Sequence, residues 1–221
     1  MLQLISKIML IQLVDRNQGM CDAWTTEFMD CEDVIIYCDD FFAPKTDCIV
    51  SPANSFGFMD GGLDGVITRR LGRQTETNVK TAIANRPMNE LLVGEALVVE
   101  TGNKEIPYCI SAPTMRVPMI LKGTPNAYLA AKATFNLLKD LKESEDWING
   151  IKIEKITISG LGTGVGQVPY EVCANQMKMA YDEVWLGKFG APKTWFDAQQ
   201  RHQMLYHTDV NNTRDLQHPE E

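Results

Sequence analysis

KITISGLGTGVGQVP, residues 155–169, is the stretch that decides the fold, because an apolar run of strand length leads directly into a glycine-rich loop. Pro169 closes the loop, and proline is a favoured first residue of a helix, so residues 169–185 are predicted to be helical. The stretch therefore predicts a strand, a loop and a helix in direct succession. In layered α/β folds such loops hold ligands beyond the carboxyl ends of the strands.

The rest of the chain repeats this alternation of strands and helices. Short apolar runs predict strands, and apolar side chains at helical spacing predict helices. The predicted strands are residues 8–14, 34–38, 47–51, 95–99, 108–111 and 155–158. The predicted helices are residues 17–29, 63–71, 75–85, 126–142 and 169–185. Several strands are continuous apolar runs, which is typical of a sheet covered on both faces, so the expected fold class is α/β in layers.

The composition predicts one domain. Of the 221 residues, 44% are hydrophobic, and no internal repeat is present. Residues 1–208 are expected to form the domain, and the polar, charged residues 209–221 are expected to form a disordered tail. The apolar residues 1–14 have no small-residue cleavage site and are interpreted as a core strand instead of a signal peptide. No apolar run approaches the roughly 20 residues of a membrane span.

Cysteine usage and charge exclude several classes of protein. None of the six cysteines forms a C-x-x-C pair, so they are interpreted as reduced core residues of a cytoplasmic protein, with no metal site. The net charge is −8, whereas proteins that bind duplex nucleic acid normally present a basic face, so such a partner is not expected. A small anionic ligand remains compatible with this charge if backbone N–H groups hold it.

The loop at residues 159–169 contains four glycines and one threonine before its helix. Consecutive backbone N–H groups in such a loop form a cradle for an anion. A P-loop would require a lysine followed by serine or threonine, which is absent. The dinucleotide-binding fingerprint fails because Gly160, Gly162 and Gly164 do not have the required spacing. A purely structural turn stays open as an alternative.

A second glycine-rich loop follows the predicted strand at residues 47–51 and reads SPANSFGFMDGGLDG, residues 51–65. Its glycines allow a close approach of backbone to ligand. Asn54 offers a donor and an acceptor, which suits a pair of sugar hydroxyl groups. The alternative is structural: Asp64 caps the following helix, and Asn54 closes a turn.

Together these segments resemble the macro domain family over most of the chain, roughly residues 8–185. An acidic residue, Asp40, precedes the strand and the segment IVSPAN, residues 49–54, and Asp64 follows Asn54 by ten residues, which is the family spacing. Later, TGV at residues 163–165 resembles the diphosphate loop of the family, and Pro169 matches its closing proline. The resemblance implies a three-layer α/β/α fold with a mixed sheet flanked by helices.

The resemblance also implies a role for each matched residue. Asp40 would accept the adenine amino proton, with Phe41 beside the base, and Asn54 would hold the distal ribose. Asn54 and Asp64 would be the catalytic residues. The implied ligand-binding residues are Asp40, Phe41, Ala53, Asn54, Gly61, Gly62, Leu63, Gly162, Thr163, Gly164, Val165 and Gly166.

The function that the resemblance implies is ADP-ribose binding, with hydrolysis of an ADP-ribosyl bond or of ADP-ribose-1″-phosphate and with no cofactor or metal. A water molecule held by Asp64 or by the diphosphate would attack. We expect Asp64 to be solvated with a pKa near 4, which makes it a weak base that orients more than it deprotonates. The alternative is a reader that binds and turns nothing over. Gly166 favours this reader, because many hydrolases of the family have at this position an aromatic residue that packs on the distal ribose.

Overall fold

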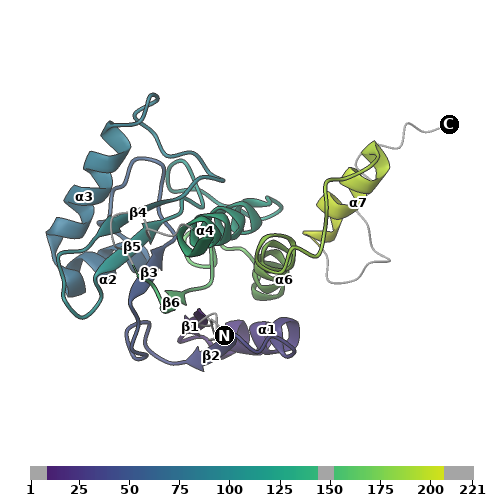
Figure 1. Ribbon diagram of the computed structural model, residues 1–221, viewed down its shortest axis with the longest axis horizontal. Helices are drawn as coiled ribbons and strands as arrows, with labels where there is room; N and C mark the ends of the chain where they lie inside the picture. The colour runs from purple at the N-terminus through teal and green to yellow at the C-terminus, as the bar shows by residue number, and fades with distance from the viewer. Residues whose placement is uncertain (1–8, 144–151, 207–221) are drawn as a thin grey trace, which may run out of the picture.

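The computed structural model describes residues 9–143 and 152–206 and contains one six-stranded sheet (Figure 1). The strands are β1 (Leu10–Asp15), β2 (Val34–Cys38), β3 (Cys48–Ser51), β4 (Leu97–Glu100), β5 (Tyr108–Ser111) and β6 (Lys155–Ile158). Their order is β2-β1-β6-β3-β5-β4, and β4 alone runs antiparallel to its neighbour. The mixed sheet that the family resemblance implied is confirmed. The predicted tail at residues 209–221 lies outside the described residues.

Helices cover both faces of this sheet. The helices α1 (Gln18–Phe28), α4 (Asn126–Glu143) and α6 (Tyr170–Ala180) form one layer, and α2 (Gly62–Leu71) and α3 (Arg73–Ala84) form the other (Figure 1). Each layer has its own apolar core against the sheet, with Trp24 and Phe135 buried on one side and Ile67 and Val79 on the other. The three-layer α/β/α architecture is therefore confirmed.

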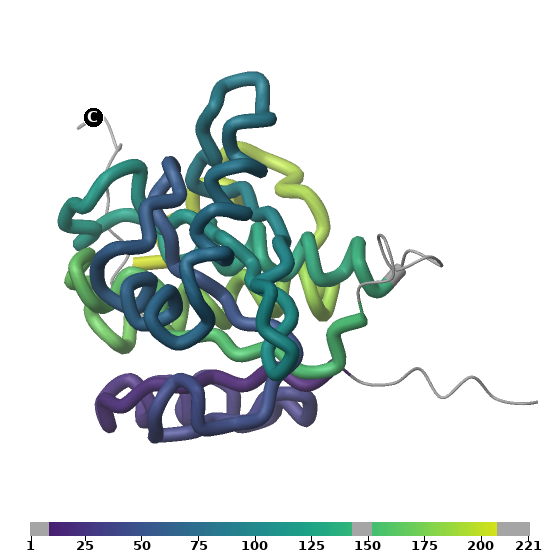
Figure 2. Tube along the Cα trace, turned by 90° about the vertical axis from the view of Figure 1, so that its left-hand side faces the viewer, coloured from purple at the N-terminus to yellow at the C-terminus, as the bar shows by residue number. Residues whose placement is uncertain are grey.

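The strand order brings the two glycine-rich loops together. The central strands β3 and β6 are parallel neighbours, with Cys48 paired to Ile156, so the loops that follow them leave the same edge of the sheet. On the other side of β6, β1 is parallel to both β6 and β2. In Figure 2 the amino-terminal part of the sheet, which contains β1 and is drawn in purple, runs along one border of the molecule. The carboxyl ends of five parallel strands thus face one side.

Two helical regions differ from the sequence prediction. The helix predicted at residues 169–185 ends at Ala180 and continues as a π-helical turn, η1 (Tyr181–Trp185). Asp33 holds this turn in place, because it accepts hydrogen bonds from the Tyr181 hydroxyl and from Nε1 of Trp185, 2.6 Å away. A further helix, α7 (Trp195–Met204), was not predicted, since few of its side chains are apolar.

Other differences are small shifts of element ends. The strand β4 begins at Leu97 instead of residue 95, because the backbone turns at Gly94, where φ is +98°. All six cysteines are free thiols. Four of them are buried, as predicted, but the prediction of core positions is wrong for Cys38, which is exposed, and for Cys31, which is only partly buried. Among the residues that the structure describes, no helix is long and apolar enough to cross a membrane. No group of three metal-binding side chains occurs within residues 9–143 and 152–206.

Candidate ligand-binding cavity

A cavity of about 430 Å³ opens at the carboxyl edge of the sheet, between the two glycine-rich loops. The structure brings all the residues that were predicted from the sequence to its walls. These are Asp40, Phe41, Ala53, Asn54, Gly61, Gly62, Leu63, Asp64, Gly162, Thr163, Gly164, Val165 and Gly166. Their roles toward a ligand remain predictions.

Asn54 closes the turn of the first loop with its side chain. Its Nδ2 donates to the carbonyl of Phe58 at 2.7 Å, and its Oδ1 accepts from the N–H groups of Phe56 and Phe58. The structural alternative for Asn54 is therefore confirmed. An amide nitrogen carries two hydrogens, so one donor remains for a ligand.

Asp64 is buried, which makes the expectation of a solvated carboxyl with a pKa near 4 wrong. Only 8% of Asp64 is exposed, and its Oδ1 accepts a hydrogen bond of 2.5 Å from the Ser51 hydroxyl. Burial raises the pKa of Asp64 to about 6; the Ser51 hydrogen bond lowers it, and the nearby carboxylates of Asp60 and Glu76 raise it further. A low-dielectric site disfavours the charged carboxylate. Asp64 therefore changes charge close to neutral pH.

Asp64 does not cap its helix, contrary to the structural alternative. The helix α2 begins at Gly62, its N-cap is Gly61, and no side chain caps it. The N–H groups of the first helical residues have no partner within a helix. Within the described residues, no protein acceptor receives the N–H groups of Gly62, Leu63 and Asp64, all of which line the cavity. This helix end is a ready anion site.

The second loop adds a further set of backbone donors. Within residues 9–143 and 152–206, no protein acceptor receives the N–H groups of residues 162–166. Gly162 has a φ of +74°, a conformation that favours glycine. The Thr163 hydroxyl stiffens the loop by donating to the Gly160 carbonyl at 3.0 Å. The loop therefore holds several of these backbone donors in a fixed arrangement, which suits an anion.

Gly166 could not carry an aromatic residue in this loop. A Cβ atom at Gly166 would lie 2.5 Å from the carbonyl oxygen of Gly162 and 2.8 Å from Cδ1 of Leu121. The Gly166 carbonyl also accepts a hydrogen bond from the Leu121 N–H at 2.7 Å, which holds the loop against the segment that contains Leu121. The absence of an aromatic residue here is thus a property of the backbone path.

Asp40 also lines the cavity, and both of its carboxylate oxygens are already paired. Its Oδ1 accepts from the N–H of Phe42 at 2.9 Å, and its Oδ2 pairs with Arg16. The Phe42 hydrogen bond and the Arg16 charge lower the pKa of Asp40 below its ordinary value. Asp40 is therefore a carboxylate across the physiological range. Phe41 is buried beside it, and its ring packs edge-on against that of Phe42.

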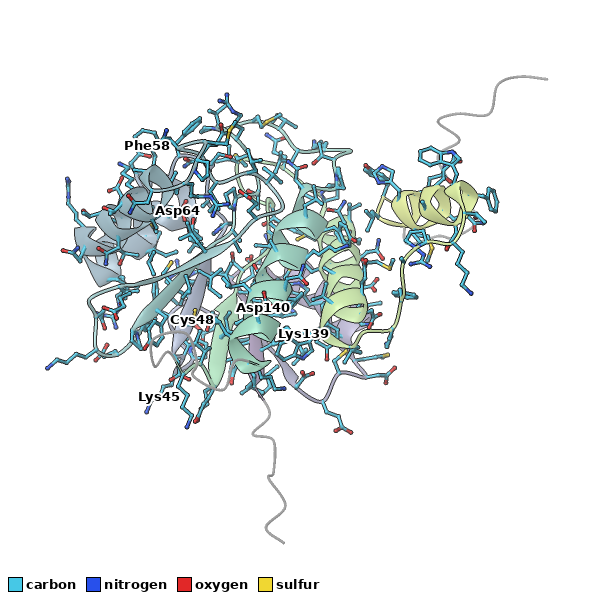
Figure 3. The ribbon with its side chains drawn as sticks, turned by 45° about the horizontal axis from the view of Figure 1, so that its top comes forward. Lys45, Cys48, Phe58, Asp64, Lys139 and Asp140 are labelled. Carbon is cyan, nitrogen blue, oxygen red and sulfur yellow. The ribbon has the colours of Figure 1, made fainter. Side chains whose placement is uncertain are left out.

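Sequence reasoning missed twelve residues of the cavity wall. Six of them end or directly follow one of the parallel strands β1, β3 and β6, namely Val14, Asp15, Arg16, Pro52, Ser159 and Gly160, so the strand order would have identified these six. The full set of twelve is Val14, Asp15, Arg16, Pro52, Phe58, Asp60, Val66, Thr114, Met115, Pro118, Ser159 and Gly160. Phe58 had no such signal, because its place depends on the turn that Asn54 closes. Figure 3 shows Phe58 and Asp64 in the same part of the molecule.

The chain belongs to the macro domain family, whose model matches residues 50–177. An uncharacterized protein of Aquifex aeolicus is 37% identical over 131 residues, which are 59% of this chain and 70% of that protein. The macrodomain of Mycobacterium tuberculosis DarG superposes with a TM-score of 0.53 at 19% identity, covering 66% of this chain and 87% of that structure. An Oceanobacillus iheyensis macrodomain with MES bound gives 0.51 at 18% identity, covering 76% and 85%. These structural likenesses support the fold.

Proposed function

We propose that this chain binds ADP-ribose in the cavity between the two glycine-rich loops and hydrolyses an ADP-ribosyl bond there. Family membership supports ADP-ribose as the ligand, because the macro domain resemblance implies it. The cavity supports it independently, since residues with two sets of backbone N–H groups that lack an acceptor among the described residues line a space of about 430 Å³. Six free thiols support a cytoplasmic location, where cysteines stay reduced.

Binding would rest on the backbone more than on charged side chains. The N–H groups at the start of α2 and those of residues 162–166 would hold the diphosphate from two sides. The carboxylate of Asp40 would accept from the adenine amino group, in competition with Arg16. The remaining amide hydrogen of Asn54 would donate to the distal ribose.

The observation that carries the proposal of hydrolysis is the raised pKa of Asp64 at the wall of the cavity. A carboxyl with a pKa of about 6, at the wall of a ligand cavity, accepts a proton far better than one with a pKa near 4. In the proposed step the oxygen of a water molecule bonds to the anomeric carbon, and Asp64 takes the proton of that water. The aglycone leaves with the electron pair of the broken bond. The bound diphosphate fixes the sugar in position for this attack.

The experiment that tests hydrolysis is incubation of the protein with mono-ADP-ribosylated protein and with ADP-ribose-1″-phosphate. The proposal expects release of free ADP-ribose from at least one of them, and loss of this release in Asp64→Asn. Calorimetry with ADP-ribose measures binding separately. If the protein binds ADP-ribose but releases no ADP-ribose from either substrate over hours, it is a reader that binds without hydrolysis.

One observation favours the reader as the second candidate. Three of the hydrogen bonds that the Asn54 side chain can form are used within its own loop. Asn54 would then hold the loop in shape and contribute less to the reacting sugar. A reader needs the cradle of N–H groups and Asp40, but it does not need a titrating Asp64.

A further inference from the structure

We infer that the distal end of the cavity, formed by Asn54, Phe58, Asp60 and Asp64, selects ADP-ribose derivatives whose 1″ group is neutral or cationic. Phe58 and Asp60 make this selection, and ADP-ribose-1″-phosphate is disfavoured. The inference rests on the proposed function, in which Asn54 and Asp64 face the distal ribose. It names the substrate class that hydrolysis at this site would take.

Phe58 provides an aromatic wall that is exposed yet held in place. Its side chain lines the cavity and is 53% exposed. Asn54 bonds both the N–H and the carbonyl of Phe58, and Nζ of Lys80 lies 4.3 Å from the centre of its ring. Lys80 is itself fixed by Oε1 of Glu76 at 2.6 Å. A fixed exposed ring offers apolar and cation–π contact to a planar or cationic group.

The charge of the distal end is negative. Of the described residues that line the cavity, Arg16 is the one with a positive charge, and it pairs with Asp40 at the adenine end. Asp60 is exposed on the wall, close enough to raise the pKa of Asp64. A 1″-phosphate carries nearly two negative charges at neutral pH and would lie beside these carboxyl groups.

The cations near the distal end do not offset this charge. Lys80 forms an ion pair with Glu76, so the two charges cancel, and neither side chain lines the cavity. Arg69 reaches back along α2, so that its Nη1 and the Asp60 carbonyl oxygen both lie within 3.2 Å of the position a Cβ atom of Gly65 would take, but Arg69 does not line the cavity. A dianion at the 1″ position would therefore meet Asp60 and Asp64 on the cavity wall, where no cationic residue lines this end of the cavity among the described residues. A guanidinium group would instead meet a carboxylate and the face of Phe58.

The test compares three ligands on an Asp64→Asn background, where turnover is slowed a hundredfold or more so that binding can be measured. The ligands are ADP-ribose, ADP-ribose-1″-phosphate and a peptide ADP-ribosylated on an arginine side chain. We expect ADP-ribose-1″-phosphate to bind about tenfold more weakly than ADP-ribose, and the arginine-linked peptide to bind at least as tightly as ADP-ribose. Adding Asp60→Asn to this background should raise the affinity for ADP-ribose-1″-phosphate about fivefold. Adding Phe58→Ala instead should lower the affinity for the arginine-linked peptide about tenfold.

Asp140→Asn is the matched control, because Asp140 is exposed on α4 and does not line the cavity, and its removal changes the net charge equally. Figure 3 labels both Asp140 and Asp64. Asp140→Asn should change none of the three affinities. Equal binding of ADP-ribose and ADP-ribose-1″-phosphate, with no effect of Asp60→Asn, would overturn the inference and leave the proposed binding intact. Loss of ADP-ribose binding in every protein would instead overturn the proposed function.

Discussion

The hydroxyl of Ser51 donates a hydrogen bond of 2.5 Å to Oδ1 of Asp64, and both side chains are buried. Ser51 is the last residue of β3, and Asp64 lies in the first turn of α2, so the bond joins the central strand to the helix that borders the cavity. Burial and hydrogen bonding act in opposite directions on the pKa of Asp64, and burial dominates. The result is a carboxyl that titrates near pH 6.

Asp64→Asn should reduce hydrolysis by a hundredfold or more, because the amide cannot take a proton from the attacking water. In the unmodified protein the rate should fall as the pH drops below about 6, where Asp64 becomes protonated. Initial rates between pH 4.5 and 8 measure both effects. A flat profile together with normal turnover in Asp64→Asn would exclude Asp64 as the base.

Ser51→Ala should move the midpoint of this pH profile upward by about one unit, because the charged carboxylate loses the donor that stabilises it. Ser55→Ala is the matched control. Ser55 is equally buried in the same loop, and its hydroxyl has no hydrogen-bond partner among the described residues. The control should leave the midpoint unchanged. An identical shift in both variants would mean that loop packing, not the hydrogen bond, sets the titration.

The stability of the protein should report the same titration. The pKa of Asp64 rises from near 4 in the unfolded chain to about 6 in the folded protein, so the folded state holds the proton more strongly. The contribution of Asp64 to stability is therefore full below pH 4 and is lost as the pH rises through 6. Relative to Asp64→Asn, the unmodified protein should lose about 2–3 kcal/mol between pH 4 and pH 7. Urea unfolding at both pH values measures this difference, and a constant difference would contradict the assignment.

The sequence predicted the layers of the fold and the two loops well, because apolar periodicity and glycine-rich junctions are local signals. Arg16 and Met115 could not be found this way, since they reach the cavity only through the strand order. The burial of Asp64 was also invisible, because it depends on the packing of α2 against β3. The π-turn after Ala180 packs its Tyr181 and Trp185 side chains onto the distant acceptor Asp33, a contact that no local pattern shows.

Asp40→Ala should weaken binding of ADP-ribose about tenfold, the scale of one charge-assisted hydrogen bond. The affinity for ribose-5-phosphate, which has no adenine, should change little. Calorimetric titration of both ligands into both proteins measures the difference. Equal losses for the two ligands would show that Asp40 supports the fold through Arg16 and Phe42 instead of contacting the base.

Gly164 is the position at which the diphosphate cradle can be blocked with the least structural cost. A Cβ atom at Gly164 would meet no atom within 4 Å. Gly164→Glu should therefore fold normally while its carboxylate repels the diphosphate. Gly164→Gln is its control, since it adds the same bulk without the charge and should bind more strongly than the glutamate variant.

Calorimetric titration with ADP-ribose of the unmodified protein and of Gly164→Glu tests the central claim most directly. The account predicts micromolar affinity for the unmodified protein, about −8 kcal/mol, and no binding by the glutamate variant with its unfolding temperature preserved. Absence of both heat and thermal shift with the unmodified protein at millimolar ADP-ribose, or unchanged affinity in Gly164→Glu, would contradict it.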